Sequence, residues 1–121
     1  IANIRLRAQA VAETQVFEGG VAITTCPQVR TDAQLICAQV ADQLLTIKGV
    51  KASFVVGRNI EERTVISARS LGDVNVQLVM EKFGGGGHLT TAAAQVSEPI
   101  RQTVDKIMKI MEVKEDDSNF E

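Results

Sequence analysis

The sequence has no tryptophan and no tyrosine, and only four of its 121 residues are phenylalanine. The core must therefore be built from the aliphatic side chains of valine, isoleucine, leucine and alanine. Apolar residues still make up 45% of the chain, which is enough for one core. A chain of this length corresponds to a single domain.

Histidine and cysteine are also scarce. His88 is the one histidine, and Cys26 and Cys37 are part of no Cys-x-x-Cys or Cys/His cluster. This pattern argues against a zinc site. Cys26 lies in a strand-like run and Cys37 in a helix-like run, so we expect both to be small buried residues of a protein kept in a reduced cytosol.

Neither an excess of positive charge nor a long apolar run is present. The net charge of −2 argues against broad nucleic-acid binding, which relies on a basic surface. We therefore expect no binding of duplex nucleic acid, and any nucleotide ligand should be small and held by a few placed groups. No stretch approaches the roughly 20 apolar residues that span a bilayer, so this piece should be soluble. The chain starts at Ile1 rather than at methionine, which suggests a fragment of a longer protein whose membrane anchor could lie elsewhere.

Strand-like and helix-like segments alternate along the chain and predict one α/β domain with a mixed β-sheet, one antiparallel hairpin and helices packed on the sheet. Residues 1–14 are interpreted as the end of a connecting helix, 15–112 as the domain and 113–121 as an acidic tail. The expected elements are a helix over 2–14, a strand over 21–26 that Pro27 stops, a helix from 31 to 47, a hairpin of 52–58 and 63–69, a helix over 74–83, a helical turn leading into a strand over 89–96, and a last helix capped by Ser97.

The helix that begins near Thr31 has the clearest signals. Thr31 and Gln34 form a capping-box pattern. Ile36, Val40, Leu44 and Ile47 then follow at helical spacing, and Gly49 is well suited to a position just past the helix end.

Four consecutive glycines, Gly84, Gly85, Gly86 and Gly87, are the most informative feature. Each costs backbone entropy on folding, so a stable domain needs a reason to keep four together. A flexible linker fits poorly because the run lies between an apolar helix and an apolar strand. Successive N–H groups without Cβ atoms can instead form a nest for phosphate. No Lys-Ser or Lys-Thr follows, so this is not a Walker loop, and a helpful helix dipole could come only from a turn near His88 or Leu89.

Several polar residues near the run have both a functional and a structural interpretation. A lone histidine is usually structural, but His88 directly follows the glycines and can donate to a phosphate oxygen. Arg69 offers a planar fork for two phosphate oxygens, or else forms a surface salt bridge. Thr90 and Thr91 could donate hydroxyls or simply lie in a strand, and Asn75 could contact a base or sugar but better suits the start of a helix.

A family resemblance rests on these residues taken together. Over roughly residues 15–112 the chain resembles the DHH-associated domain of DHH-family phosphoesterases. The motifs that carry the resemblance are Ser67-Ala68-Arg69-Ser70, Asn75-Val76-Gln77, Gly84 to Thr90, Ala92-Ala93 and Gln95. Leu89-Thr90 and Asn75-Val76-Gln77 favour the GdpP type, the cyclic-di-AMP phosphodiesterases, over nanoRNA-degrading relatives. One departure is Ala92-Ala93-Ala94, where many members have Ala-Gly.

The resemblance implies a role in substrate binding. In such enzymes an upstream DHH domain holds two manganese ions that activate water for attack on a phosphodiester, and the DHH-associated domain closes over the cleft. This chain would then bind a cyclic dinucleotide or short oligonucleotide, cooperate with the DHH domain of the same polypeptide, and contain neither catalytic residues nor metal ligands. The implied substrate-binding residues are Arg69, Gly84, Gly85, Gly86, Gly87 and His88, followed by Ser67, Ser70, Asn75 and Thr90.

The resemblance also implies a cytoplasmic domain of a membrane-anchored parent, which could be a homodimer, and a fragment that is inactive by itself. Two alternatives stay open. The first is a nanoRNA-degrading or RecJ-like phosphoesterase, which shares the chemistry and differs in substrate. The second is a non-catalytic nucleotide-binding or RNA-binding module like the related domain at the end of alanyl-tRNA synthetases, against which the mild acidity argues.

Overall fold

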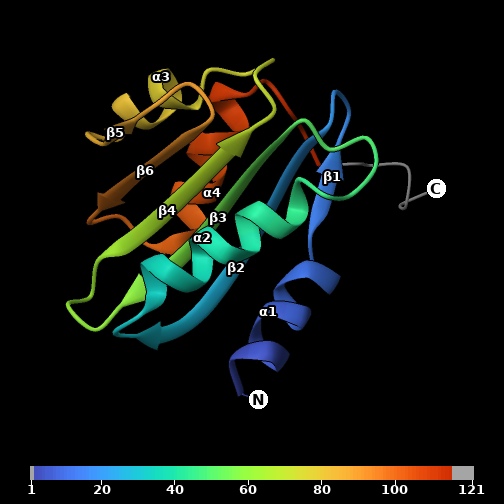
Figure 1. Cartoon of the computed structure of the whole chain (residues 1–121). Coiled ribbons are helices and arrows are strands. Elements are labelled where there is room, and N and C mark those ends of the chain that lie inside the picture. The colour runs from blue at the N-terminus through green and yellow to red at the C-terminus, as the bar shows by residue number, and fades with distance from the viewer. Residues whose placement is uncertain (1, 116–121) are drawn as a thin grey trace.

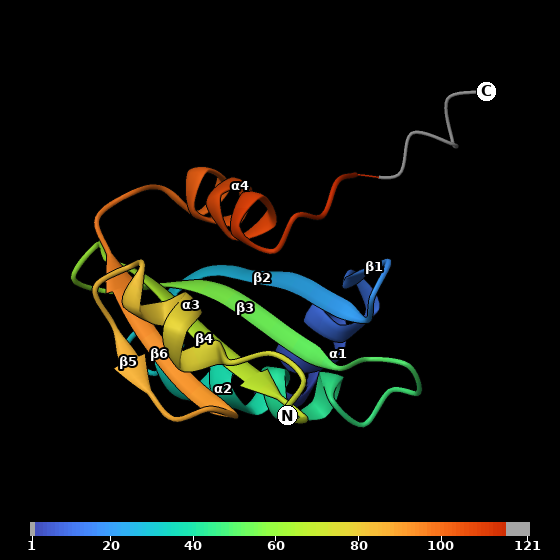
Figure 2. The ribbon, with the colours of Figure 1, turned by 90° about the horizontal axis from the view of Figure 1, so that it is seen from above.

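The computed structural model describes residues 2–115 as one six-stranded sheet with helices on both faces (Figures 1 and 2). The strand order is β1-β2-β3-β4-β6-β5. In chain order the elements are α1 (Ala2–Ala12), β1 (Gln15–Phe17), β2 (Val21–Arg30), α2 (Ala33–Leu44), β3 (Ala52–Asn59), β4 (Thr64–Ser70), α3 (Val76–Glu81), β5 (Gly86–Gly87), β6 (Thr91–Val96) and α4 (Ile100–Ile110).

The sheet is mixed. β2 and β3 run parallel and are joined through α2, whereas every other neighbouring pair is antiparallel. β3 and β4 form the expected hairpin, in register from Ala52 opposite Ser70 to Arg58 opposite Thr64. The predicted α/β fold with one mixed sheet is therefore confirmed.

The alternation of side chains along β3 creates two separate cores. Phe54 and Val56 face α3 and α4, whereas Val55 faces α1 and α2, and all three are fully buried. Successive residues of a strand point to opposite faces, so a strand covered on both sides must be apolar at nearly every position. Figure 2 shows α4 on one side of the sheet and α1 and α2 on the other.

Helix α2 follows the predicted apolar spacing only as far as Leu44. Ile36, Val40 and Leu44 are buried, but Ile47 lies beyond the helix and is 38% exposed. The predicted capping box is wrong, because the N-cap is Asp32 and has no side-chain cap bond. Gln34 instead directs its side chain to β4, where its amide donates to the Ile66 carbonyl and to Ser67.

Pro27 does not end β2, contrary to the prediction. The strand continues to Arg30, and its pairing with β3 shifts register between Cys26 and Val29. β1 pairs only with residues 21–23, so within residues 2–115 the part of β2 around Pro27 has no strand partner on its outer side. A residue without an N–H is tolerated at an edge or a bulge.

The remaining boundaries differ in detail. Pro99, not Ser97, is the N-cap of α4. The helices expected over 2–14 and 74–83 are the shorter α1 and α3. No helical turn begins near Leu89, which lies with Thr90 in a tight connection between β5 and β6. The predicted tail over 113–121 lies outside the described residues from 116 onward.

Cys26 and Cys37 are both buried in the core beneath α2, as expected. A hydrogen bond with Cys26, together with burial, raises the pKa of the Cys37 thiol, which therefore stays protonated. Its sulfur fills the space that a side chain at Gly57 would need, since an added Cβ there would lie 2.6 Å from Sγ. Both side chains therefore fill space in the hydrophobic core between α2 and the sheet.

Candidate functional site

The candidate site lies on the α2 side of the sheet, beyond the edge of that helix. α2 packs on β2, β3 and β4, and β6 and β5 extend past it (Figure 1). Thr91 is exposed there, and Ala93 and Gly86 are half-buried. We call the surface formed by Arg69, Thr91, Ala93 and Gly86 the open sheet face.

Strand register brings Arg69 and His88 to the two sides of one residue. Arg69 of β4 pairs with Thr91 of β6. On the other side of Thr91, the His88 N–H donates to its carbonyl at 2.7 Å and continues the β5–β6 register. Neighbouring strands are about 4.8 Å apart. Arg69 and His88, which are 19 positions apart in the chain, therefore lie in one row across the sheet with Thr91 between them.

Gly84 and Gly85 have structural reasons to be glycine. Gly84 has a φ of +80°, and together they form a Schellman motif at the end of α3: the Gly84 N–H donates to the Glu81 carbonyl and the Gly85 N–H to the Met80 carbonyl. A Cβ on Gly85 would overlap the Ala93 carbonyl and lie 2.6 Å from the Ala94 Cβ. These two glycines allow α3 and β5 to pack on β6.

Gly87, like Gly85, has no room for a side chain, whereas Gly86 does. Gly87 has a φ of +147°, and an added Cβ would overlap the Thr91 carbonyl and lie 2.8 Å from the Ala92 Cβ. An added Cβ on Gly86 would meet nothing within 4 Å, and its φ is not in the left-handed region. Gly86 pairs with Ala93, so the missing side chain of Gly86 belongs to the open sheet face. Within the described chain, the fold supplies no reason for glycine at position 86.

Several backbone N–H groups of the glycine run are already engaged. Those of Gly84, Gly85 and His88 donate within the chain. Antiparallel pairs alternate between hydrogen-bonded and non-hydrogen-bonded, and His88 and Thr91 occupy the bonded type. Gly87 is then in the pair whose N–H points away from β6, toward the outer edge of β5. The run therefore offers an anion one outward N–H and an uncovered surface rather than a complete nest.

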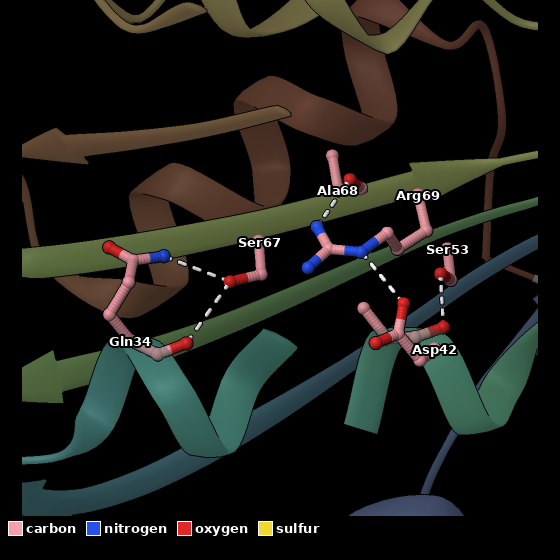
Figure 3. Close-up of polar contacts among 7 residues, drawn as sticks. Gln34, Asp42, Ser53, Ser67, Ala68 and Arg69 are labelled. Carbon is pink, nitrogen blue, oxygen red and sulfur yellow. Dashed lines mark hydrogen bonds and ion pairs between the residues drawn. The ribbon is translucent and has the colours of Figure 1, made fainter. Parts of the chain in front are cut away.

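Arg69 reaches from β4 toward α2, as Figure 3 shows. Its Nε donates to Asp42 Oδ1 at 2.7 Å and its Nη1 to the Ala68 carbonyl at 3.0 Å. The Arg69 side chain is 14% exposed and the Asp42 side chain 65% exposed. Arginine has five N–H donors, and these two contacts leave the end-on fork of Nη1 and Nη2 available. The salt bridge and the phosphate-binding interpretation of Arg69 are thus compatible.

Ser67 has a structural role in the described contacts. Its side chain is fully buried under α2, where its hydroxyl accepts from the Gln34 amide at 2.9 Å (Figure 3). This contact joins the first turn of α2 to the middle of β4. Whether Ser67 also contacts a substrate remains a prediction from the family motif.

Ser70, Asn75 and Thr90 lie where the chain turns between elements. The Ser70 hydroxyl accepts from the N–H groups of Gly72 and Val74 and is buried. Asn75 is the N-cap of α3, as its structural interpretation expected, and accepts from the Leu78 N–H. The Thr90 carbonyl accepts from the Ser70 N–H while the residue itself is exposed. The contacts of Ser70 and Asn75 order the loop beside the open sheet face.

Sequence reasoning missed Asp42 and Gln34. Asp42 lies 27 residues before Arg69 on a different element, and its position on α2 reads as an ordinary solvated helix residue. No local pattern marks it as the partner of Arg69. Only the packing of α2 against β4 reveals the contact.

The described residues do not fit a metal centre. Among residues 2–115, no three or more histidine, cysteine, aspartate or glutamate side chains are placed to hold an ion. No helix within the same range is long and apolar enough to span a membrane.

Comparisons with known proteins identify the relatives of this chain. The DHHA1 domain model matches residues 19–114. The chain is 49% identical over 98 residues to the cyclic-di-AMP phosphodiesterase GdpP of Geobacillus thermodenitrificans and 46% identical over 93 residues to GdpP of Bacillus subtilis. These alignments cover 81% and 75% of this chain but only 15% and 14% of the relatives.

A solved structure shares the fold at lower identity. The exopolyphosphatase-related protein of Bacteroides fragilis superimposes with a TM-score of 0.79 at 20% identity, over 92% of this chain and 34% of that one. At this identity the likeness shows the fold alone. The match to the domain model over most of the chain, together with the two phosphodiesterase relatives, shows that the chain belongs to the DHHA1 domain family.

Proposed function

We propose that this chain is the substrate-binding domain of a cyclic-di-AMP phosphodiesterase, which hydrolyses the cyclic dinucleotide to linear pApA. The observation that carries the proposal is the row of Arg69, Thr91 and His88 beside the uncovered Gly86, in a chain 49% identical to a cyclic-di-AMP phosphodiesterase. The guanidinium of Arg69, the imidazole of His88 and the backbone at Gly86, which no side chain covers, suit the binding of a phosphate group and its sugar.

Each group at the open sheet face would make a different contact with the ligand. The free end-on fork of Arg69 would hold two phosphate oxygens of the ligand, since guanidinium geometry matches that of phosphate. His88 would donate to an oxygen on which charge develops during hydrolysis. Gly86 would let the ligand approach the backbone, and the outward N–H of Gly87 would donate to it.

The metal chemistry would belong to a different part of the polypeptide. The family resemblance implies a DHH domain that would hold two manganese ions and whose metals would supply the activation of water, and the described residues of this chain provide no such cluster. We therefore expect the 121-residue chain alone to bind and orient the ligand but not to cleave it. The same resemblance implies a cytoplasmic position in a membrane-anchored parent protein.

Steady-state kinetics of the full-length protein with manganese and cyclic-di-AMP would test this function. Arg69→Ala should raise KM about tenfold or more, because a charge-assisted contact contributes about 1.5–3 kcal/mol and about 1.4 kcal/mol is a factor of ten. Arg63→Ala is the matched control, since Arg63 is exposed just before the same strand and, among residues 2–115, its guanidinium donates only to the Gln95 carbonyl. Wild-type constants in Arg69→Ala would show that the substrate binds elsewhere.

A substrate comparison would separate the phosphodiesterase classes. Cyclic-di-AMP and a short linear oligonucleotide should be given to the same preparation, with the rate of each measured at several concentrations. A kcat/KM that favours the cyclic dinucleotide is expected. A strong preference for the linear oligonucleotide would instead indicate a nanoRNA-degrading enzyme.

A further inference from the structure

We propose that Asp42 is a positioning residue for the substrate, which fixes the guanidinium of Arg69 so that its end-on fork faces the ligand. The inference rests on the proposed function and assigns a role to a residue of α2 that no motif of the chain includes. Asp42 would not touch the ligand. It would act entirely through Arg69.

The contacts of Arg69 define one orientation of its planar group. Asp42 accepts from Nε at 2.7 Å on one side, and the Ala68 carbonyl accepts from Nη1 at 3.0 Å on another (Figure 3). Two acceptors in different directions fix both the position and the plane of a guanidinium. The N–H groups left over among the described contacts are one on Nη1 and two on Nη2, and one N–H from each of these nitrogens forms the end-on fork.

The location of Asp42 also limits the cost of its own charge. A carboxylate beside a phosphate-binding arginine repels the ligand, but the Asp42 side chain is 65% exposed, and water and salt screen such a charge. Arg69, in contrast, is only 14% exposed, so its long side chain is already ordered before any ligand binds. Pre-organisation of this kind improves binding by reducing the freedom lost on association.

The geometry distinguishes this role from simple competition. A carboxylate that occupied the end-on fork would have to leave before a phosphate could bind, and its removal would then tighten binding. Asp42 instead occupies Nε, which leaves that fork open. Removal of Asp42 should therefore weaken substrate binding.

The test is a double-mutant cycle in the full-length protein, with kcat and KM measured for cyclic-di-AMP hydrolysis in the presence of manganese. The variants are Asp42→Ala, Asp42→Asn, Arg69→Ala and the combination of Asp42→Ala with Arg69→Ala. Asp105→Ala is the matched control because it removes the same charge from α4, on the opposite face of the sheet, where Asp105 pairs with Arg101.

Asp42→Ala should raise KM about three- to tenfold with kcat nearly unchanged, a change of the size that one ordinary net hydrogen bond contributes. Asp42→Asn should lose less, since the amide oxygen can still accept from Nε. In the Arg69→Ala background, Asp42→Ala should change KM by less than about twofold, because contacting residues couple whereas independent ones add. Asp105→Ala should match the wild type.

Three results would overturn the role of Asp42. These are a lower KM in Asp42→Ala, an unchanged KM in that variant, or an equal effect of Asp42→Ala whether or not Arg69 is present. Each can be recognised only if the wild-type protein hydrolyses cyclic-di-AMP. Absence of wild-type hydrolysis would refute the proposed function itself, and with it a role for Asp42 in that reaction.

Discussion

Replacement of single glycines in the run offers the sharpest test of the open sheet face. Gly86→Ala and Gly86→Val add side chains where the described structure has open space, and a β-branched residue suits a strand. The folded chain should tolerate both, and a gain of about 0.4–1 kcal/mol is expected from the reduced freedom of the unfolded chain. Gly85→Ala forces a Cβ against the Ala93 carbonyl and to 2.6 Å from the Ala94 Cβ, and overpacking of this kind costs about 1–3 kcal/mol.

Thermal unfolding of the 121-residue chain would measure the difference. At this size each kcal/mol shifts Tm by roughly 4 °C, so Gly85→Ala should melt about 4–12 °C below the wild type while Gly86→Ala melts at or slightly above it. Gly87→Ala should resemble Gly85→Ala, with added strain from its φ of +147°.

Kinetics of the full-length variants would complete the test. Gly86→Val should raise KM for cyclic-di-AMP about tenfold or more, even though it is as stable as the wild type, because its side chain occupies the surface that the ligand approaches. Wild-type kinetics in a stable Gly86→Val protein would refute the assignment of this surface to substrate binding. A wild-type Tm in Gly85→Ala would refute the packing argument for that glycine.

Three further outcomes are expected. His88→Ala in the full-length protein should lower kcat by about tenfold or more as well as raise KM, because His88 is proposed to follow developing charge; steady-state kinetics would show this, and an effect on KM alone would contradict it. Ser67→Ala should destabilise the chain by about 0.5–1.5 kcal/mol in a urea titration through loss of its contact with Gln34, with KM unchanged in the full-length protein if Ser67 is only structural. The hydrogen bond from Arg30 lowers the pKa of Asp32. The ionised Asp32 therefore stabilises the fold above its ordinary pKa near 3.8, and this stability is lost as the pH falls through the lower pKa of the folded state. Thermal unfolding midpoints measured from pH 6 to pH 2 should fall less steeply in Asp32→Asn than in the wild type.

Local patterns predicted elements well where one signal dominated. The two β-rich runs around residues 59–62 formed the β3–β4 hairpin, and the spacing of Ile36, Val40 and Leu44 placed the buried face of α2. Boundaries failed where a tertiary contact competed with a local one. Gln34 was expected to cap its own helix but donates to β4, and Pro27 was expected to end a strand that continues along a partly unpaired edge.

The sequence by itself determined the family, because the run from Gly84 to His88 and the Ser67–Ser70 motif are contiguous and need no folding to be recognised. Tertiary structure revealed the two-sided burial of β3, because alternation along the strand places Phe54 and Val55 in two different cores. Tertiary structure alone decided which glycines the fold requires, because Gly85 and Gly87 are limited by β6 and Gly86 is not. It alone paired Arg69 with Asp42, since a contact across 27 residues depends on how α2 packs on the sheet and leaves no trace in local sequence.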